Sequence, residues 1–139
     1  MWIFYAILSA VSASLVAILG KLGLKNVDST LATTVRSIIM ALFLMITSLS
    51  LGKFAGFSLQ SFTGRDWALI AGSGIAGAIS WLFYFFALKF GPASAVSAID
   101  RTSLVFVVIL AAFFLGEVLT WKSILGAICM VAGAILIVL

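Results

Sequence analysis

Five long apolar stretches, separated by short polar segments, constrain the fold of this chain more than any other feature. A helix needs about 20 mostly apolar residues to cross a hydrocarbon core of about 30 Å. The stretches of this length are 2–22, 30–51, 67–88, 94–115 and 121–138. Backbone polar groups in lipid must be satisfied within one segment, and no stretch alternates with the period of a β-strand. We therefore predict an all-α integral membrane bundle of five transmembrane helices, multi-pass in the cell membrane and in contact with the lipid bilayer.

The composition agrees with this fold class and argues against several functions. Hydrophobic residues make up 65% of the chain and charged residues only 9%, against about 25% charged in an average soluble domain. The net charge of +4 comes from basic residues spread along the sequence, so we expect no nucleic-acid binding. The chain has no histidine and a single cysteine, Cys129, which argues against a metal site and a Ser/His/Asp hydrolase. We therefore predict a protein that is not an enzyme and has no cofactor.

Capping residues indicate where several helices begin. Asp28 and Ser29 are N-cap candidates for the second helix, because short polar side chains can accept hydrogen bonds from the first turn. Thr63 and Asp66 have the spacing of a capping box ahead of the third helix. Thr120 can cap the fifth helix in the same way.

The segments between the helices are short. Gly91-Pro92 should break the chain between the third and fourth helices, because proline cannot continue a helix. The segment 54–62 is too short to cross and is either a loop or a short interfacial helix. We interpret 2–22 as a membrane helix rather than a signal peptide, because no basic side chain precedes it. Residues 1–139 are treated as a single domain.

The distribution of lysine and arginine gives little instruction about orientation. Five spans place the chain termini on opposite sides of the membrane. Each side carries three basic residues near the span ends: Lys53, Arg65 and Lys122 on the side of Met1, and Lys21, Lys25 and Lys89 on the other. A balanced count is what a chain inserting in both orientations would show, while one fixed orientation is the alternative.

Three charged residues are predicted to lie inside the spans. Arg36 lies six residues after position 30, and Asp100 and Arg101 lie six and seven residues after position 94. At 1.5 Å per residue, all three would lie roughly 10 Å from the same face. A charge in the bilayer costs about 2.5–3.5 kcal/mol on insertion scales, so we expect these residues to serve a purpose.

We interpret these charges, together with Trp81 and Tyr84 at comparable depth in the third span, as a candidate substrate site. Asp100 could pair with Arg36 or Arg101 and leave the other guanidinium free to bind a carboxylate or phosphate. Trp81 and Tyr84 would form an aromatic wall around the apolar part of the ligand. In the alternative, the arginines extend to the headgroups, Asp100 neutralises one of them, and the aromatic residues only pack.

Glycines predict close approaches between helices. Three lie at the start of the third span, and two lie seven residues apart on the fifth: Gly72, Gly74 and Gly77, and Gly126 and Gly133. Small residues let helix backbones approach in a membrane, so the fifth helix is a candidate subunit contact.

The sequence from Trp81 to Leu139 resembles the EamA domain of the drug/metabolite transporter superfamily. The resemblance is carried by WLFYFFALKFGPASAV at 81–96, by FLGE at 114–117, and by Gly126 and Gly133. It implies a multi-helix carrier, often an exporter, that moves small metabolites by alternating access. Many members hold two such domains of opposite orientation in one chain. The single copy here therefore implies an antiparallel homodimer that rebuilds a ten-helix inverted repeat.

Two departures from related proteins limit what the resemblance implies. Many members have a proline within the fourth helix, where this chain reads IDRTS at 99–103. Related small multidrug-resistance proteins have four spans and an essential glutamate in the first helix, where this chain has no carboxylate. We predict an exporter of small polar or anionic metabolites. The alternatives are a non-transporting structural subunit and a flippase of a lipid-linked headgroup.

Overall fold

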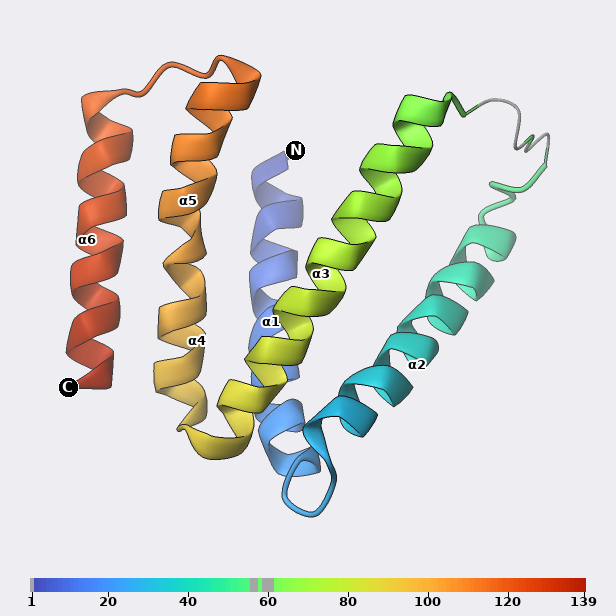
Figure 1. The fold of residues 1–139 in the computed structure, drawn as a ribbon, viewed down its shortest axis with the longest axis horizontal. Coiled ribbons are helices and arrows are strands. Elements are labelled where there is room, and N and C mark those ends of the chain that lie inside the picture. The colour runs from blue at the N-terminus through green and yellow to red at the C-terminus, as the bar shows by residue number, and fades with distance from the viewer. Residues whose placement is uncertain (1, 56–57, 59–61) are drawn as a thin grey trace. The chain divides into compact units, whose positions relative to one another are not determined.

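The computed structural model describes residues 2–55, 58 and 62–139 (Figure 1). In this part of the chain, every regular element is helical, and five helical spans are long and apolar enough to cross a membrane. The prediction of an all-α membrane protein with five spans is confirmed. The elements are α1 Trp2–Gly23, α2 Ser29–Ser50, α3 Gly64–Phe90, α4 Ala93–Arg101, α5 Ser103–Leu110, the π-helical turn η2 Ala111–Leu115, and α6 Trp121–Val138.

The predicted cap of α2 is formed by Asp28. Its Oδ1 accepts hydrogen bonds from the N–H groups of Thr30 at 2.9 Å and Leu31 at 3.1 Å, whereas Ser29 is the first helical residue. The hydrogen bond from the Leu31 amide is the main cause that lowers the pKa of Asp28 below its ordinary value. A carboxylate at this end also complements the helix dipole.

The capping box of α3 is formed, and it makes this helix longer than expected. The Thr63 N–H donates to Asp66 Oδ2 at 2.9 Å, and the Asp66 N–H donates to Thr63 Oγ1 at 3.3 Å. The helix therefore begins at Gly64 rather than at residue 67. Thr120 caps α6 as predicted, accepting from the Ser123 N–H at 3.2 Å. Of the segment 54–62, residues 56–57 and 59–61 lie outside the described residues, so the choice between a loop and an interfacial helix stays a prediction.

The fourth span is not one continuous α-helix. It extends over Ala93–Leu115, close to the predicted 94–115, but α4 ends at Arg101 and α5 begins at Ser103. Between them, Thr102 directs both its N–H and its hydroxyl to the Ile99 carbonyl, at 2.9 and 2.6 Å. Such a tightened turn interrupts the regular hydrogen bonds of a helix without a proline.

The span ends in a left-handed turn that requires glycine. Gly116 has φ of 69°, and the Glu117 N–H donates back to the Ala111 carbonyl at 3.3 Å. Because the preceding turn is π-helical, this bond spans one residue more than the corresponding bond of a Schellman cap, and the glycine adopts the left-handed conformation without a Cβ clash. Glu117 therefore lies in the turn that leads to α6.

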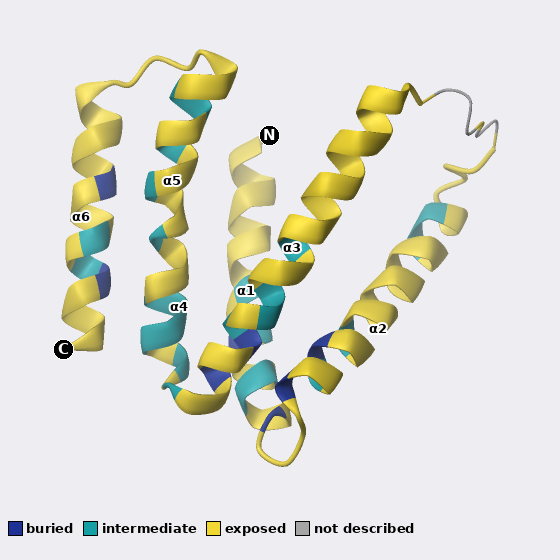
Figure 2. Ribbon diagram, viewed as in Figure 1, coloured by how far each residue is buried: buried dark blue, intermediate teal, exposed yellow. Residues whose placement is uncertain are grey.

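The chain divides into two compact units, Met1–Leu22 with Phe90–Leu139, and Gly23–Lys89. In the first, which we call unit 1, α1 and α6 run opposite to α4 and α5, and α4 packs along α6 (Figure 1). Ala127 and Ala134, seven residues apart on α6, are buried on one face (Figure 2).

In the second, unit 2, α2 and α3 run in opposite directions. The buried residues lie in the segment before α2, at the start of α2 and at the end of α3 (Figure 2): Leu24, Ser29, Thr33, Phe85 and Leu88. The apolar residues along the rest of both helices are mostly exposed, as expected for helices that face lipid. The treatment of 1–139 as one domain stays a prediction.

Within each unit, the glycines do not mark close approaches between the described helices. A Cβ added at Gly72, Gly74, Gly77, Gly126 or Gly133 would meet nothing within 4 Å. The expectation that these glycines bring helices together is therefore wrong for the described residues within each unit. A role in a subunit contact stays a prediction.

Candidate functional site

Arg36 of α2 stacks on the aromatic residues of α3 in unit 2. Its Cζ lies 3.8 Å from the centroid of the Trp81 ring and 5.3 Å from that of Phe85. The Trp81 ring meets Tyr84 edge-on at 5.5 Å and Phe85 at 6.0 Å. A guanidinium over an aromatic face is stabilised by the ring's quadrupole, the more so where water is excluded.

The spacing of the aromatic residues explains this arrangement. Trp81, Tyr84 and Phe85 occupy positions i, i+3 and i+4 of α3, so they lie on one face of that helix. Trp81 and Tyr84 are half-buried, while Phe85 is only 3% exposed. Our sequence interpretation missed Phe85, although its position four residues after Trp81 was a signal for it.

Within unit 2, the described residues leave the donors of the Arg36 guanidinium unused. Among them, it makes ring contacts but no hydrogen bond and no ion pair. Stacking engages the face of the guanidinium plane, and the N–H groups point outward from its edge. An arginine held in this way can offer two parallel N–H donors to a carboxylate or phosphate.

Hydroxyl groups share the beginning of α2 with Arg36. Thr33 Oγ1 donates to the Ser29 carbonyl at 2.7 Å, and Ser37 Oγ donates to the Thr33 carbonyl at 2.8 Å. Since their hydrogens are engaged by the helix backbone, these hydroxyl oxygens remain acceptors. The polar character of this end of α2 therefore extends beyond the arginine.

Asp100 and Arg101 are the last residues of α4, in unit 1, and both side chains are exposed. Among the described residues, no ion pair joins them, since adjacent side chains on a helix do not face each other. The proposed pairing of Asp100 with Arg101 is thus not formed. A pairing with Arg36 would join the two units and stays a prediction.

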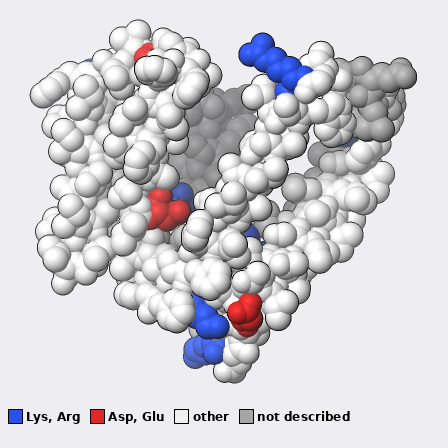
Figure 3. All heavy atoms as spheres, in the orientation of Figure 1, with Lys and Arg blue, Asp and Glu red and all other residues white. Residues whose placement is uncertain are grey.

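Two lysines bind backbone carbonyls at the helix ends. Lys21 Nζ donates to the Gly91 carbonyl at 2.8 Å within unit 1, and Lys89 Nζ donates to the Val27 carbonyl at 3.4 Å within unit 2. Figure 3 shows few charged side chains on this face of the molecule, and most of the described surface belongs to other residues. The lysines thus stabilise chain turns, whereas the described residues of their own units leave the donors of Arg36 and Arg101 unused.

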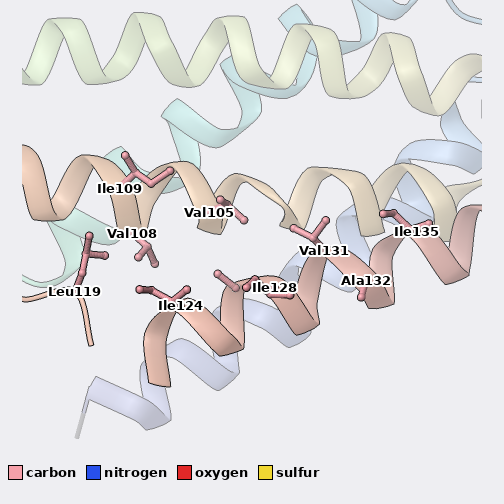
Figure 4. A pocket seen from close by; sticks show the side chains of 10 residues that line it. Val105, Val108, Ile109, Leu119, Ile124, Ile128, Val131, Ala132 and Ile135 are labelled. Carbon is pink, nitrogen blue, oxygen red and sulfur yellow. The ribbon is translucent and has the colours of Figure 1, made fainter. Parts of the chain in front are cut away.

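An apolar groove of about 440 Å³ lies between α5 and α6 in unit 1 (Figure 4). Aliphatic side chains line it, among them Val105 and Val108 of α5 and Ile128 and Val131 of α6. The described lining residues offer no polar side chain to recognise a charged solute. A polar ligand would bind more favourably to the arginines.

Five apolar helical spans, with charged residues inside the second and the fourth, define a multi-pass integral membrane protein of the cell membrane. The chain belongs to the EamA-like transporter family, whose sequence model matches residues 1–139, and it is a membrane transporter. A curated protein of Sinorhizobium sp. named "Uncharacterized transporter in cobO 3'region" is 38% identical over 136 residues, which cover 98% of this chain and 95% of that one. No solved structure matches the chain significantly. The resemblance to the EamA domain is confirmed, and the protein contacts the bilayer and binds a transported substrate.

Proposed function

We propose that the protein exports small polar or anionic metabolites by alternating access, as an antiparallel homodimer. The observation that carries this proposal is Arg36, stacked 3.8 Å over Trp81, with its donors unused by the described residues of unit 2. An ionised group inside a membrane span is costly unless it has a function. The stack reduces this cost without using the hydrogen-bonding edge, which then serves an anionic substrate.

The aromatic cluster adds a ring surface beside the guanidinium against which a ligand can pack. Trp81 and Tyr84 are half-buried, so parts of both rings remain accessible beside the guanidinium. Ligand sites typically combine apolar and aromatic walls with a few polar groups that fix orientation. Arg36, Trp81 and Tyr84 together have this composition.

The interruption of the fourth span supports a role for Asp100 and Arg101 in substrate contact. Transporters commonly place substrate sites where a transmembrane helix is discontinuous, because the freed backbone and nearby polar groups can bind solutes there. Here both charged residues come immediately before the break at Thr102. We propose them as substrate contacts alongside Arg36, Trp81 and Tyr84.

The homodimer is supported by the charged residues and glycines that a single chain leaves uncovered. Asp100 and Arg101 are exposed inside a span, where contact with lipid would cost about 2.5–3.5 kcal/mol each. The five glycines of α3 and α6 have open space beside them that a second copy can fill. The balanced lysine and arginine count permits the opposite insertion of two copies, which would rebuild an inverted repeat.

Flux into proteoliposomes tests the transport site. The reconstituted protein should move at least one of three labelled anions: lactate, succinate or gluconate. Arg36→Gln should reduce that flux about 10- to 100-fold, as expected for the loss of a charged hydrogen bond. Arg65→Gln is the matched control, because Arg65 is an exposed residue in the first turn of α3. Equal flux for folded Arg36→Gln and wild type would remove Arg36 from the mechanism. Absence of flux for every anion tested would contradict the assignment of anionic substrates.

Reporter fusions at Leu139 test the antiparallel arrangement. Two reporters, each active on one side of the membrane only, should both give signal if the chain inserts in two orientations. Lys25→Gln and Lys53→Gln, which remove one charge from opposite ends of α2, should shift the ratio of the two signals in opposite directions. Signal from one reporter alone would contradict dual insertion.

A further inference from the structure

A second groove in unit 1 ends at Arg101. It has a volume of about 440 Å³ and lies between α1 and α4. Residues at positions i, i+3 and i+7 of α4 and a run of small residues on α1 line it: Ser94, Ser97 and Arg101, and Ala13, Ser14 and Ala17. Its volume falls within the range of about 300–1,000 Å³ typical of small-molecule sites.

The shape of the groove follows from small side chains. Alanine and serine on both helices leave space between the backbones that larger residues would fill. None of the described residues that line it is aromatic, in contrast to the surroundings of Arg36. The groove therefore suits a slender, flexible solute rather than a ring system.

The charge of the groove selects a monoanion. Arg101 is the only ionisable side chain among its described lining residues, and Asp100 is not among them. One guanidinium balances one carboxylate, with which it can form a two-point contact. A phosphate monoester would bring a second negative charge that is poorly compensated in apolar surroundings.

The serine hydroxyl groups of the groove favour a ligand that brings its own hydrogen-bond donors. Ser14 Oγ donates to the Val11 carbonyl at 2.7 Å, so its free lone pairs face any ligand as acceptors. An ammonium group would meet no acidic lining residue and would be repelled by Arg101. Neutral hydroxyl groups on the ligand can donate hydrogen bonds to the serine oxygens and are not repelled by Arg101.

We propose that this groove binds a small polyhydroxylated carboxylate, for which gluconate is the probe. This proposal rests on the proposed function and names its substrate class, with the carboxylate at Arg101 and the hydroxyl chain along Ser14, Ser94 and Ser97. The hydroxyl chain takes the place of water along these serines as the solute enters the span.

Equilibrium binding of labelled gluconate to the full-length protein in lipid nanodiscs tests the proposal. Hexanoate has the same chain length without hydroxyl groups, and sorbitol has the hydroxyl groups without the charge. Each should compete at least about tenfold more weakly than gluconate, because each lacks one set of hydrogen bonds. Gluconate 6-phosphate should also compete more weakly. Equal competition by hexanoate or sorbitol, or tighter binding of the phosphate, would overturn the proposal.

Two serines on α1 provide matched variants. Ser12 and Ser14 both donate to carbonyls of their own helix, at 2.9 and 2.7 Å, but only Ser14 lines the groove. Ser14→Ala should weaken gluconate binding about fivefold, as for one hydrogen bond, and Ser12→Ala should leave it unchanged. Arg101→Gln should abolish detectable binding. The same affinity for the Ser12 and Ser14 variants would exclude this groove.

The binding assay separates this inference from the proposed function. Flux of another anion that depends on Arg36, without gluconate binding, would refute the groove proposal and leave the transport proposal intact. Gluconate binding that depends on Ser14, without flux of any anion, would support the groove proposal and refute anion transport.

Discussion

The two units each hold an arginine inside a membrane span, but in different surroundings. Arg36 lies in contact with Trp81 and Phe85, in a part of unit 2 where Phe85 is buried. Arg101 lines an open groove of alanine and serine in unit 1 and has no ring partner among the described residues. The chain thus fixes one guanidinium through its own aromatic side chains and leaves the other accessible.

The largest effect is expected from Phe85→Ala, which would disrupt the packing that holds Arg36. Phe85 is 3% exposed, so its truncation should lower the free energy of unfolding by about 3 kcal/mol. Phe83→Ala is the control, because Phe83 is 68% exposed on the same helix. Unfolding in mixed micelles, followed by circular dichroism, measures both variants. Similar losses for the two would contradict a specific packing role for Phe85.

A double-mutant cycle would sharpen the contrast by measuring the stack itself. Arg36→Gln and Trp81→Leu should show a coupling energy of about 1 kcal/mol in the free energy of unfolding, as expected for a partly desolvated cation–π contact. Arg65→Gln with Trp81→Leu should show no coupling, because 16 positions of α3 separate these residues. A coupling near zero for Arg36 would mean that the stack contributes nothing.

The break beside Arg101 can be tested with Thr102→Val, which keeps the shape of the side chain and removes its hydroxyl. Loss of the 2.6 Å bond to the Ile99 carbonyl should let the two half-helices join. Amide hydrogen exchange around residue 102 should then slow, with a stability change of about 1 kcal/mol or less. Thr34→Val is the control, because Thr34 donates to Thr30 within continuous α2. Unchanged exchange would show that the hydroxyl does not maintain the break.

The smallest effect is expected at Asp28, the N-cap of α2, which is the helix that carries Arg36. Because hydrogen bonds from the Leu31 and Thr30 amides lower the pKa of Asp28, its ionised cap stabilises the folded state fully above the ordinary value of 3.8. That contribution should disappear as the pH falls through the lowered folded-state pKa. Asp28→Asn can still accept a hydrogen bond but does not titrate in this range. Thermal unfolding should be measured from pH 7 to 3. The difference in midpoint temperature between the wild type and Asp28→Asn should shrink below the ordinary pKa of 3.8. A constant difference would contradict the assignment.

Local signals in the sequence predicted much of the fold. Span length and hydropathy determined the five helices, and the caps at Asp28, Thr63 and Thr120 formed because they depend on neighbouring residues alone. The break at Thr102 was not predicted, because it arises from a threonine hydroxyl and not from a proline. Threonine occurs in many uninterrupted helices, so its presence alone does not indicate a break.

The candidate site was less accessible to sequence reasoning. Depth counted along the helices placed Arg36 and Trp81 at comparable levels, but only the three-dimensional arrangement of α2 and α3 determines that their side chains stack. The same packing made Phe85 part of the cluster. The groove at Arg101 depends on small residues of two spans that are distant in the sequence, so no local pattern could indicate it.

The interruption at Thr102 also has an electrostatic consequence. Because α4 stops at Arg101, the partial negative charge of that helix's C-terminus, about half an elementary charge, falls beside the guanidinium. An unbroken helix would place this charge about four turns further on, near the turn at Gly116. Arg101 thus lies in the last turn of α4, where the helix dipole favours a cation by about 0.3–1 kcal/mol, an effect that the N-terminus of α5 at Ser103 partly offsets.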